Sequence, residues 1–170
     1  MREYFIWSLF FVLPVYVAGQ HFNFNRIRVS AINSLEKGSG AKRVFYDYPI
    51  GVAGDYFPGR EKFALAQPII YRKKINNFTF ETSYFYSRTD SFVRLIEYAW
   101  EGTDKSGIPR FYTIVKNNKR KLSAYFGNPG KEIPATEVKS ETAIWENELV
   151  YVEQFIAPGL YRIRVLVSWK

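Results

Sequence analysis

Hydrophobic residues recur with two different periods along this chain, and each period predicts a different kind of element. An apolar stripe at spacings of three and four begins at Phe111, and most basic residues nearby lie on the other side. Pro109 suits the first turn of a helix, and Gly127 followed by Pro129 suits its end. The pattern therefore predicts a helix from about Pro109 to Phe126. Its stripe consists of Phe111, Ile114, Val115, Asn118, Leu122, Tyr125 and Phe126.

A shorter stripe near the N-terminus predicts a second helix. Phe24, Ile27, Ala31 and Leu35 also recur at spacings of three and four. The segment 37–40 contains two glycines, which can adopt the left-handed conformation that ends a helix. Residues 23–29 alternate as well, so a strand is the alternative there.

Alternation with period two predicts the strands. Two of them, 77–86 and 91–100, read as a hairpin across a four-residue turn, with Tyr86 opposite Ser91 and Phe80 opposite Glu97. Ala157-Pro158-Gly159 is typical of a tight turn between the last two strands. The remaining predicted strands are 43–48, 142–145, 149–156 and 160–169.

This order of helices and strands predicts an α+β fold, an antiparallel β-sheet packed against one long and one short α-helix in a single domain. Breakers are dense from Pro49 to Gly59, which predicts the longest loop. Loops of this length often carry function. The polar residues of this region are Asp47, Asp55, Tyr56, Arg60 and Glu61.

The first residues have the pattern of a cleavable export signal. Arg2 precedes a charge-free run from Tyr4 to Val17, which is shorter than the about 20 residues of a membrane span, and small residues follow it. We therefore expect residues 1–19 to be a signal peptide and 20–170 to be the mature domain, periplasmic or secreted, without a transmembrane anchor. A buried N-terminal strand is the alternative for the apolar run.

Two segments carry a resemblance to a known group of proteins. The segment 82–100 reads TSYFYSRTDSFVRLIEYAW, and YFGNP from Tyr125 to Pro129 ends the long predicted helix. In these segments the chain resembles small exported bacterial proteins of unknown function. The resemblance implies a bacterial envelope location and implies no particular chemistry.

Composition excludes several kinds of chemistry. The chain has no cysteine and a single histidine, His21, so cysteine nucleophiles, disulfides and His-dependent triads in the folded body are excluded. Zinc sites usually need several such ligands, and we expect no metal and no cofactor. His21 could chelate copper or nickel with the amino terminus if the mature chain began at Gly19.

Carboxylate chemistry is the enzymatic alternative, because paired Asp and Glu side chains can hydrolyse glycosides. Its candidates are Asp47, Asp55, Glu61 and Glu97, although Glu97 also suits a carboxylate paired with an arginine or lysine. The protein would then be a carboxylate-dependent hydrolase that acts on envelope polysaccharide.

The formal net charge of +8 suits an anionic surface, although it also favours solubility. Candidate binding residues are Arg72, Lys73, Lys74, Lys119 and Arg120. The sequence favours a non-enzymatic envelope protein with a binding or structural role. We expect its partner to be an anionic envelope polymer, lipid headgroups or another envelope protein, and we expect no nucleic acid.

Overall fold

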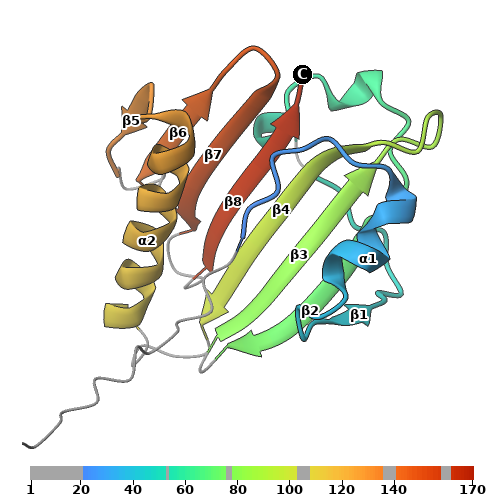
Figure 1. The fold of residues 1–170 in the computed structure, drawn as a ribbon, viewed down its shortest axis with the longest axis horizontal. Helices are drawn as coiled ribbons and strands as arrows, with labels where there is room; N and C mark the ends of the chain where they lie inside the picture. Colours follow the sequence, from blue (N-terminus) through green and yellow to red (C-terminus); the bar gives the residue numbers. More distant parts are fainter. Residues whose placement is uncertain (1–20, 53, 76–77, 103–107, 136–140, 158–161) are drawn as a thin grey trace, which may run out of the picture.

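The computed structural model describes residues 21–52, 54–75, 78–102, 108–135, 141–157 and 162–170. The predicted leader and the turn at Pro158-Gly159 lie outside these residues. Within them, eight strands form one antiparallel sheet with the order β1-β2-β3-β4-β8-β7-β6-β5 (Figure 1). The strands are β1 (Lys42–Val44), β2 (Ile69–Ile75), β3 (Phe78–Tyr86), β4 (Val93–Gly102), β5 (Lys131–Ile133), β6 (Thr142–Glu146), β7 (Val150–Ala157) and β8 (Arg162–Trp169).

The predicted α+β class, with one long and one short helix packed on the sheet, is wrong. The described chain is mainly an eight-stranded antiparallel sheet with only two short helices, α1 (Ile32–Glu36) and α2 (Ile108–Phe126). Two strands, β2 and β5, were not predicted, because β2 carries three consecutive basic residues and β5 lies in a polar segment. Irregular segments also cover the sheet, namely residues 22–28, which were predicted to be partly helical, and the segment between β1 and β2, which was predicted to contain the longest loop.

The two helices depart from their predictions to different degrees. α2 begins and ends close to the predicted residues, and its Leu122 is fully buried. The predicted first helix fails at its start, since residues 22–28 are not helical and only a 3-10 turn (Val29–Ala31) precedes α1. Phe24 and Ile27 still contact the core, so their burial does not depend on a helix.

The central hairpin is confirmed as a hairpin, but its predicted register is wrong. Phe80 lies opposite Trp100 rather than Glu97, and Tyr86 lies opposite Val93 rather than Ser91. A register irregularity at Phe85/Tyr86 and a left-handed backbone at Ser91 (φ 59°) accompany the longer turn. Because side chains alternate between faces, this odd shift exchanges the faces of β4 relative to β3.

The sheet has an internal symmetry that the sequence did not reveal. Each half of the described chain runs through one α-helix and then four strands, and β4 and β8 meet antiparallel at the centre. One continuous line of register partners crosses all eight strands and joins Arg43 and Glu132, the middle residues of the two edge strands. This line is Arg43, Tyr71, Thr82 and Tyr98 in the first half, and Val165, Gln154, Ala143 and Glu132 in the second.

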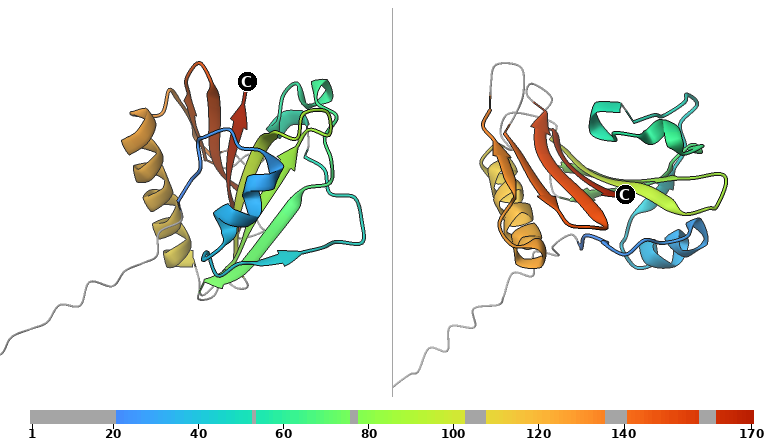
Figure 2. Two further views of the ribbon diagram at one scale, coloured as in Figure 1. Left: turned by 45° about the vertical axis from the view of Figure 1, so that its right-hand side comes forward. Right: turned by 90° about the horizontal axis from the view of Figure 1, so that it is seen from above.

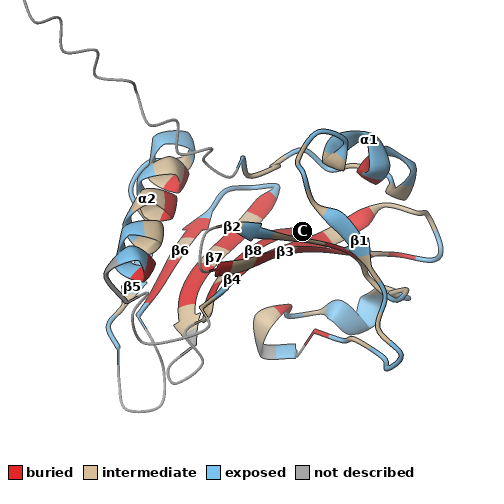
Figure 3. Ribbon diagram, turned by 90° about the horizontal axis from the view of Figure 1, so that it is seen from below, coloured by how far each residue is buried: buried red, intermediate tan, exposed pale blue. Residues whose placement is uncertain are grey.

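The two faces of the sheet are covered by different parts of the chain (Figure 2, Figure 3). We call the face under α1 and α2 the helix face. Hydrogen bonds from Tyr84 to Glu36 and from Trp145 to Ser123 join the sheet to the helices there. We call the opposite face the loop face, because the segment between β1 and β2 lies on it. Its smaller core consists of Val52, Phe57, Phe85, Leu95, Phe155 and Leu166.

Candidate functional site

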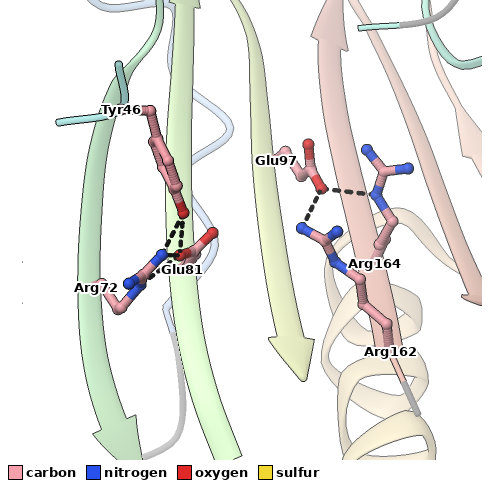
Figure 4. Close-up of polar contacts among 6 residues, drawn as sticks. All are labelled: Tyr46, Arg72, Glu81, Glu97, Arg162 and Arg164. Atoms are coloured by element: carbon pink, nitrogen blue, oxygen red, sulfur yellow. Dashed lines mark hydrogen bonds and ion pairs between the residues drawn. The ribbon is translucent and has the colours of Figure 1, made fainter. Parts of the chain in front are cut away.

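The loop face holds two clusters of charged side chains beside its apolar core (Figure 4). The first lies on the central strands, where Glu97 of β4 accepts a hydrogen bond from Nε of Arg164 on β8 at 2.6 Å. Arg162 Nη2 lies 3.7 Å from the same carboxylate oxygen. Glu97 is buried, so its charge is balanced by these two arginines rather than by water.

Aromatic rings cover the arginine side of this first cluster. The guanidinium of Arg164 lies over the rings of Tyr56 and Phe155, at 4.8 and 5.3 Å from their centroids. Tyr56 belongs to the β1–β2 segment and stacks on Phe155 at 4.9 Å. The cluster therefore fastens this segment to the sheet, and a structural role explains it.

The second cluster joins Arg72 of β2 and Glu81 of β3 to Tyr46, which follows β1. Arg72 Nε donates to Glu81 Oε1 at 2.5 Å, and the Tyr46 hydroxyl donates to the same oxygen at 3.0 Å. Arg72 also donates to the Tyr46 hydroxyl. Partial burial and the bond to Glu81 raise the pKa of Tyr46, so its phenol stays neutral. These bonds hold the Tyr46 ring beside β2.

Exposed cations and rings surround this second cluster. Lys42 lies directly opposite Arg72 on the edge strand, and Lys74 follows Arg72 on the same face. Both lysines are exposed, and neither belongs to an ion pair among the described residues. Tyr48 is 61% exposed, and its ring centroid lies 5.2 Å from that of Tyr46. We call Lys42, Tyr46, Tyr48, Arg72 and Lys74 the basic patch.

The other predicted binding residues lie elsewhere. Lys73 points to the helix face, where it donates to the Ser39 carbonyl oxygen at 3.0 Å. Lys119 of α2 pairs with Glu132 at 2.8 Å. Arg120, also on α2, is exposed. Since α2 lies against β6 and the basic patch lies on β1 and β2, the structure does not bring the two predicted groups together.

The predicted catalytic carboxylates do not form a contact cluster. Asp47 and Glu61 are exposed, and neither contacts Glu97 in the described structure. The side chain of Asp55 lies outside the described residues. Glu97 is instead the ion-pair partner that the sequence offered as its alternative role. Glu81, which the prediction omitted, shares a face with Glu97 but is likewise bonded to an arginine.

Surface hollows, groups of possible metal ligands and apolar helices were the remaining kinds of site to consider among the described residues. Two shallow hollows lie around β5, β6 and the β6–β7 turn, and neither is lined by a predicted site residue. In the described ranges no three His, Cys, Asp or Glu side chains gather as a metal site would require. No helix in those ranges is long and apolar enough to cross a membrane.

Lys42, Tyr46 and Tyr48 are members of the basic patch that the sequence analysis missed. Lys42 directly precedes the predicted strand 43–48 and the two tyrosines lie within it, and only the pairing of β1 with β2 places them beside Arg72. Period-two alternation alone could have separated Lys73 from Arg72 and Lys74. The alternation within β2 was therefore a signal that the sequence contained. The pairing of β2 with β1 was the information that it did not contain.

Comparisons with protein-family models, curated proteins and solved structures gave no match for this chain. The resemblance to small exported bacterial proteins stays a sequence-based expectation.

Proposed function

We propose that the protein is an exported, non-enzymatic domain that binds an acidic polysaccharide through the basic patch. The observation that carries this proposal is the pair of exposed lysines, Lys42 and Lys74, beside two tyrosine rings on one edge of the loop face. Export rests on the charge-free run after Arg2.

The composition of the basic patch favours a charged sugar polymer over a small ligand. Lysine and arginine bind carboxylate or sulfate groups, and the exposed ring of Tyr48 offers an apolar face to a sugar ring. Glu81 neutralises Arg72 but neither of the two lysines, so the patch keeps the positive charges of Lys42 and Lys74. The patch lies at the sheet edge and coincides with neither shallow hollow, which suits an extended polymer better than an enclosed substrate.

The test measures binding of the mature chain to polygalacturonate, with dextran as a neutral control polymer. We expect binding to polygalacturonate only, and a steep loss with salt because exposed charges are screened over about 8 Å at physiological ionic strength. The variant Lys42→Glu/Lys74→Glu should weaken binding by about tenfold or more. The matched control is Lys116→Glu/Arg120→Glu, which makes the same charge change on exposed positions of α2.

The outcomes separate the alternatives. Equal weakening by both double variants would mean that net charge alone attracts the polymer, and would contradict the basic patch as a site. Binding to anionic vesicles without binding to polygalacturonate would mean that the ligand is a lipid headgroup and not an acidic polysaccharide. Release of reducing sugar from the polymer would contradict the non-enzymatic role.

A further inference from the structure

Residues 22–28 form a segment, here called the strap, that runs over the helix face between α2 and α1 (Figure 1). The strap contains no helix or strand, apart from an isolated bridge between Arg28 and Phe92. Its C-terminal part is held by backbone bonds, since Val93 N donates to Ile27 O at 2.9 Å. The guanidinium of Arg28 also lies 4.4 Å from the ring centroid of Phe92.

The N-terminal part of the strap is bound by side chains of the sheet. The backbone N–H of Asn23 donates to the Tyr98 hydroxyl at 2.9 Å, and Trp169 Nε1 donates to the Phe24 carbonyl oxygen at 3.2 Å. Tyr98 and Trp169 are both buried, so these two groups are fixed in place. They bond the backbone of the strap, whatever side chains it carries.

Two phenylalanines of the strap enter aromatic surroundings. The Phe22 centroid lies 5.1 Å from that of Tyr98 in an edge contact, and Phe24 lies 4.4 Å from Tyr125 and 4.9 Å from Phe126. Phe22 also makes an edge contact with Trp100 at 6.4 Å. We call Tyr98, Trp100, Tyr125, Phe126 and Trp169 the strap site.

The strap residues in this site are not fully buried. Phe22, Asn23 and Phe24 are all partly exposed, and Tyr125 is 62% exposed although it contacts Phe24. No backbone ladder holds Phe22 to Phe24, whereas Ile27 and Val29 bond to the chain around Ser91 and Val93. The first three residues are therefore attached by side-chain contacts of the sheet and α2, separately from the backbone bonds that hold the rest of the strap.

We propose that the strap site is a peptide-binding site for a segment with aromatic residues two positions apart, and that the strap is its displaceable resident occupant. The bound strap defines the ligand class. It supplies two rings separated by one residue, one backbone N–H for Tyr98 and one backbone carbonyl for Trp169. A partner protein with such a segment would replace Phe22 and Phe24.

The experiment uses the full mature chain with Phe22→Ala/Phe24→Ala, which removes both rings from the site and leaves only the backbone bonds of the strap. The probe is a fluorescent synthetic peptide with the sequence of residues 20–27, measured by anisotropy. The variant should bind it at least about tenfold more tightly than the unchanged protein, whose tethered strap competes at a high effective concentration. A peptide with alanine at both phenylalanine positions should not bind. Equal binding to both proteins, or binding to neither, would overturn the proposal.

A second measurement does not depend on the double variant. The chain has no cysteine, so Asn25→Cys in the otherwise unchanged protein takes a single spin label at an exposed position of the strap. Excess peptide with both phenylalanines should raise the mobility of the label, and the alanine peptide should not. Unchanged mobility with saturating peptide would mean that the strap is a permanent part of the core.

Discussion

Glu97 and Arg164 occupy equivalent positions in the two halves of the sheet, and their side chains pair across its central strands at 2.6 Å. Each residue directly precedes a member of the central pair, Tyr98 and Val165. Only 8% of the Glu97 side chain and 18% of the Arg164 side chain are exposed. An acidic residue in one half thus meets a basic residue in the other at the centre of the sheet.

This pair should be strongly coupled. Glu97→Leu leaves Arg164 without its partner in a largely buried place and should cost about 3 to 5 kcal/mol of unfolding free energy. The double variant Glu97→Leu/Arg164→Met should cost clearly less than the sum of the two single variants, because neither Glu97 nor Arg164 is left as an unpaired charge. The loss of the longer contact with Arg162 is common to Glu97→Leu and the double variant, and the Arg162 side chain is 31% exposed. Urea unfolding measures all three, and Lys119→Ala, which breaks the more exposed pair with Glu132, is the control at about 1 kcal/mol or less. Additive single effects would show that Glu97 and Arg164 are independent.

The stripe of α2 can be tested at Leu122, which is fully buried. Leu122→Ala removes packing against the sheet and should lower the unfolding free energy by about 2 to 5 kcal/mol. Lys116→Ala on the exposed side of the same helix is the control, with a change within about 0.5 kcal/mol. A loss at Leu122 no larger than this control would contradict its role in the core.

Stability should fall in alkaline solution. Burial and the hydrogen bond to Glu36 raise the pKa of Tyr84, and burial raises the pKa of Tyr98 against the opposing bond from Asn23. The unfolded chain releases these protons near pH 10 while the folded protein retains them. The stabilisation that comes from these raised pKa values is therefore complete below about pH 10. Above that pH, each tyrosine lowers the free energy of unfolding by about 1.4 kcal/mol per pH unit.

Urea midpoints between pH 8.5 and 11 measure this slope. Tyr84→Phe should reduce it, whereas Tyr112→Phe, at an exposed tyrosine of α2, should leave it unchanged. A slope that is the same in all three proteins would mean that Tyr84 does not retain its proton.

The prediction of export rests on the first 19 residues alone. Expression of the full chain in a bacterium should yield a periplasmic or secreted product whose intact mass begins at or near Gln20. Arg2→Glu, which removes the positive charge before the apolar run, should retain the uncleaved chain in the cytoplasm. A full-length cytoplasmic product from the unchanged sequence would contradict the prediction.

Local patterns predicted the elements of this protein better than their partners. The stripe of α2 and the alternation of β8 are strong because each faces one continuous core. The register of the hairpin was missed because the longer turn around Ser91 has no distinctive composition. The symmetry was hidden because equivalent positions differ in chemistry, as Glu97 and Arg164 do. The basic patch depends on a strand pairing, which no local pattern contains.

The boundary between the halves is bridged on both faces by segments of the first half. On the helix face the strap reaches Trp169 and Tyr125, and on the loop face Tyr56 stacks on Phe155. A chain divided between β4 and α2 would give two polypeptides, each with four neighbouring strands. Their reassembly would restore the β4–β8 pairing together with the strap contacts on the helix face and the Tyr56–Phe155 stacking on the loop face. Such fragments therefore suit a complementation assay in which recovery of the fold reports that two tagged proteins have met.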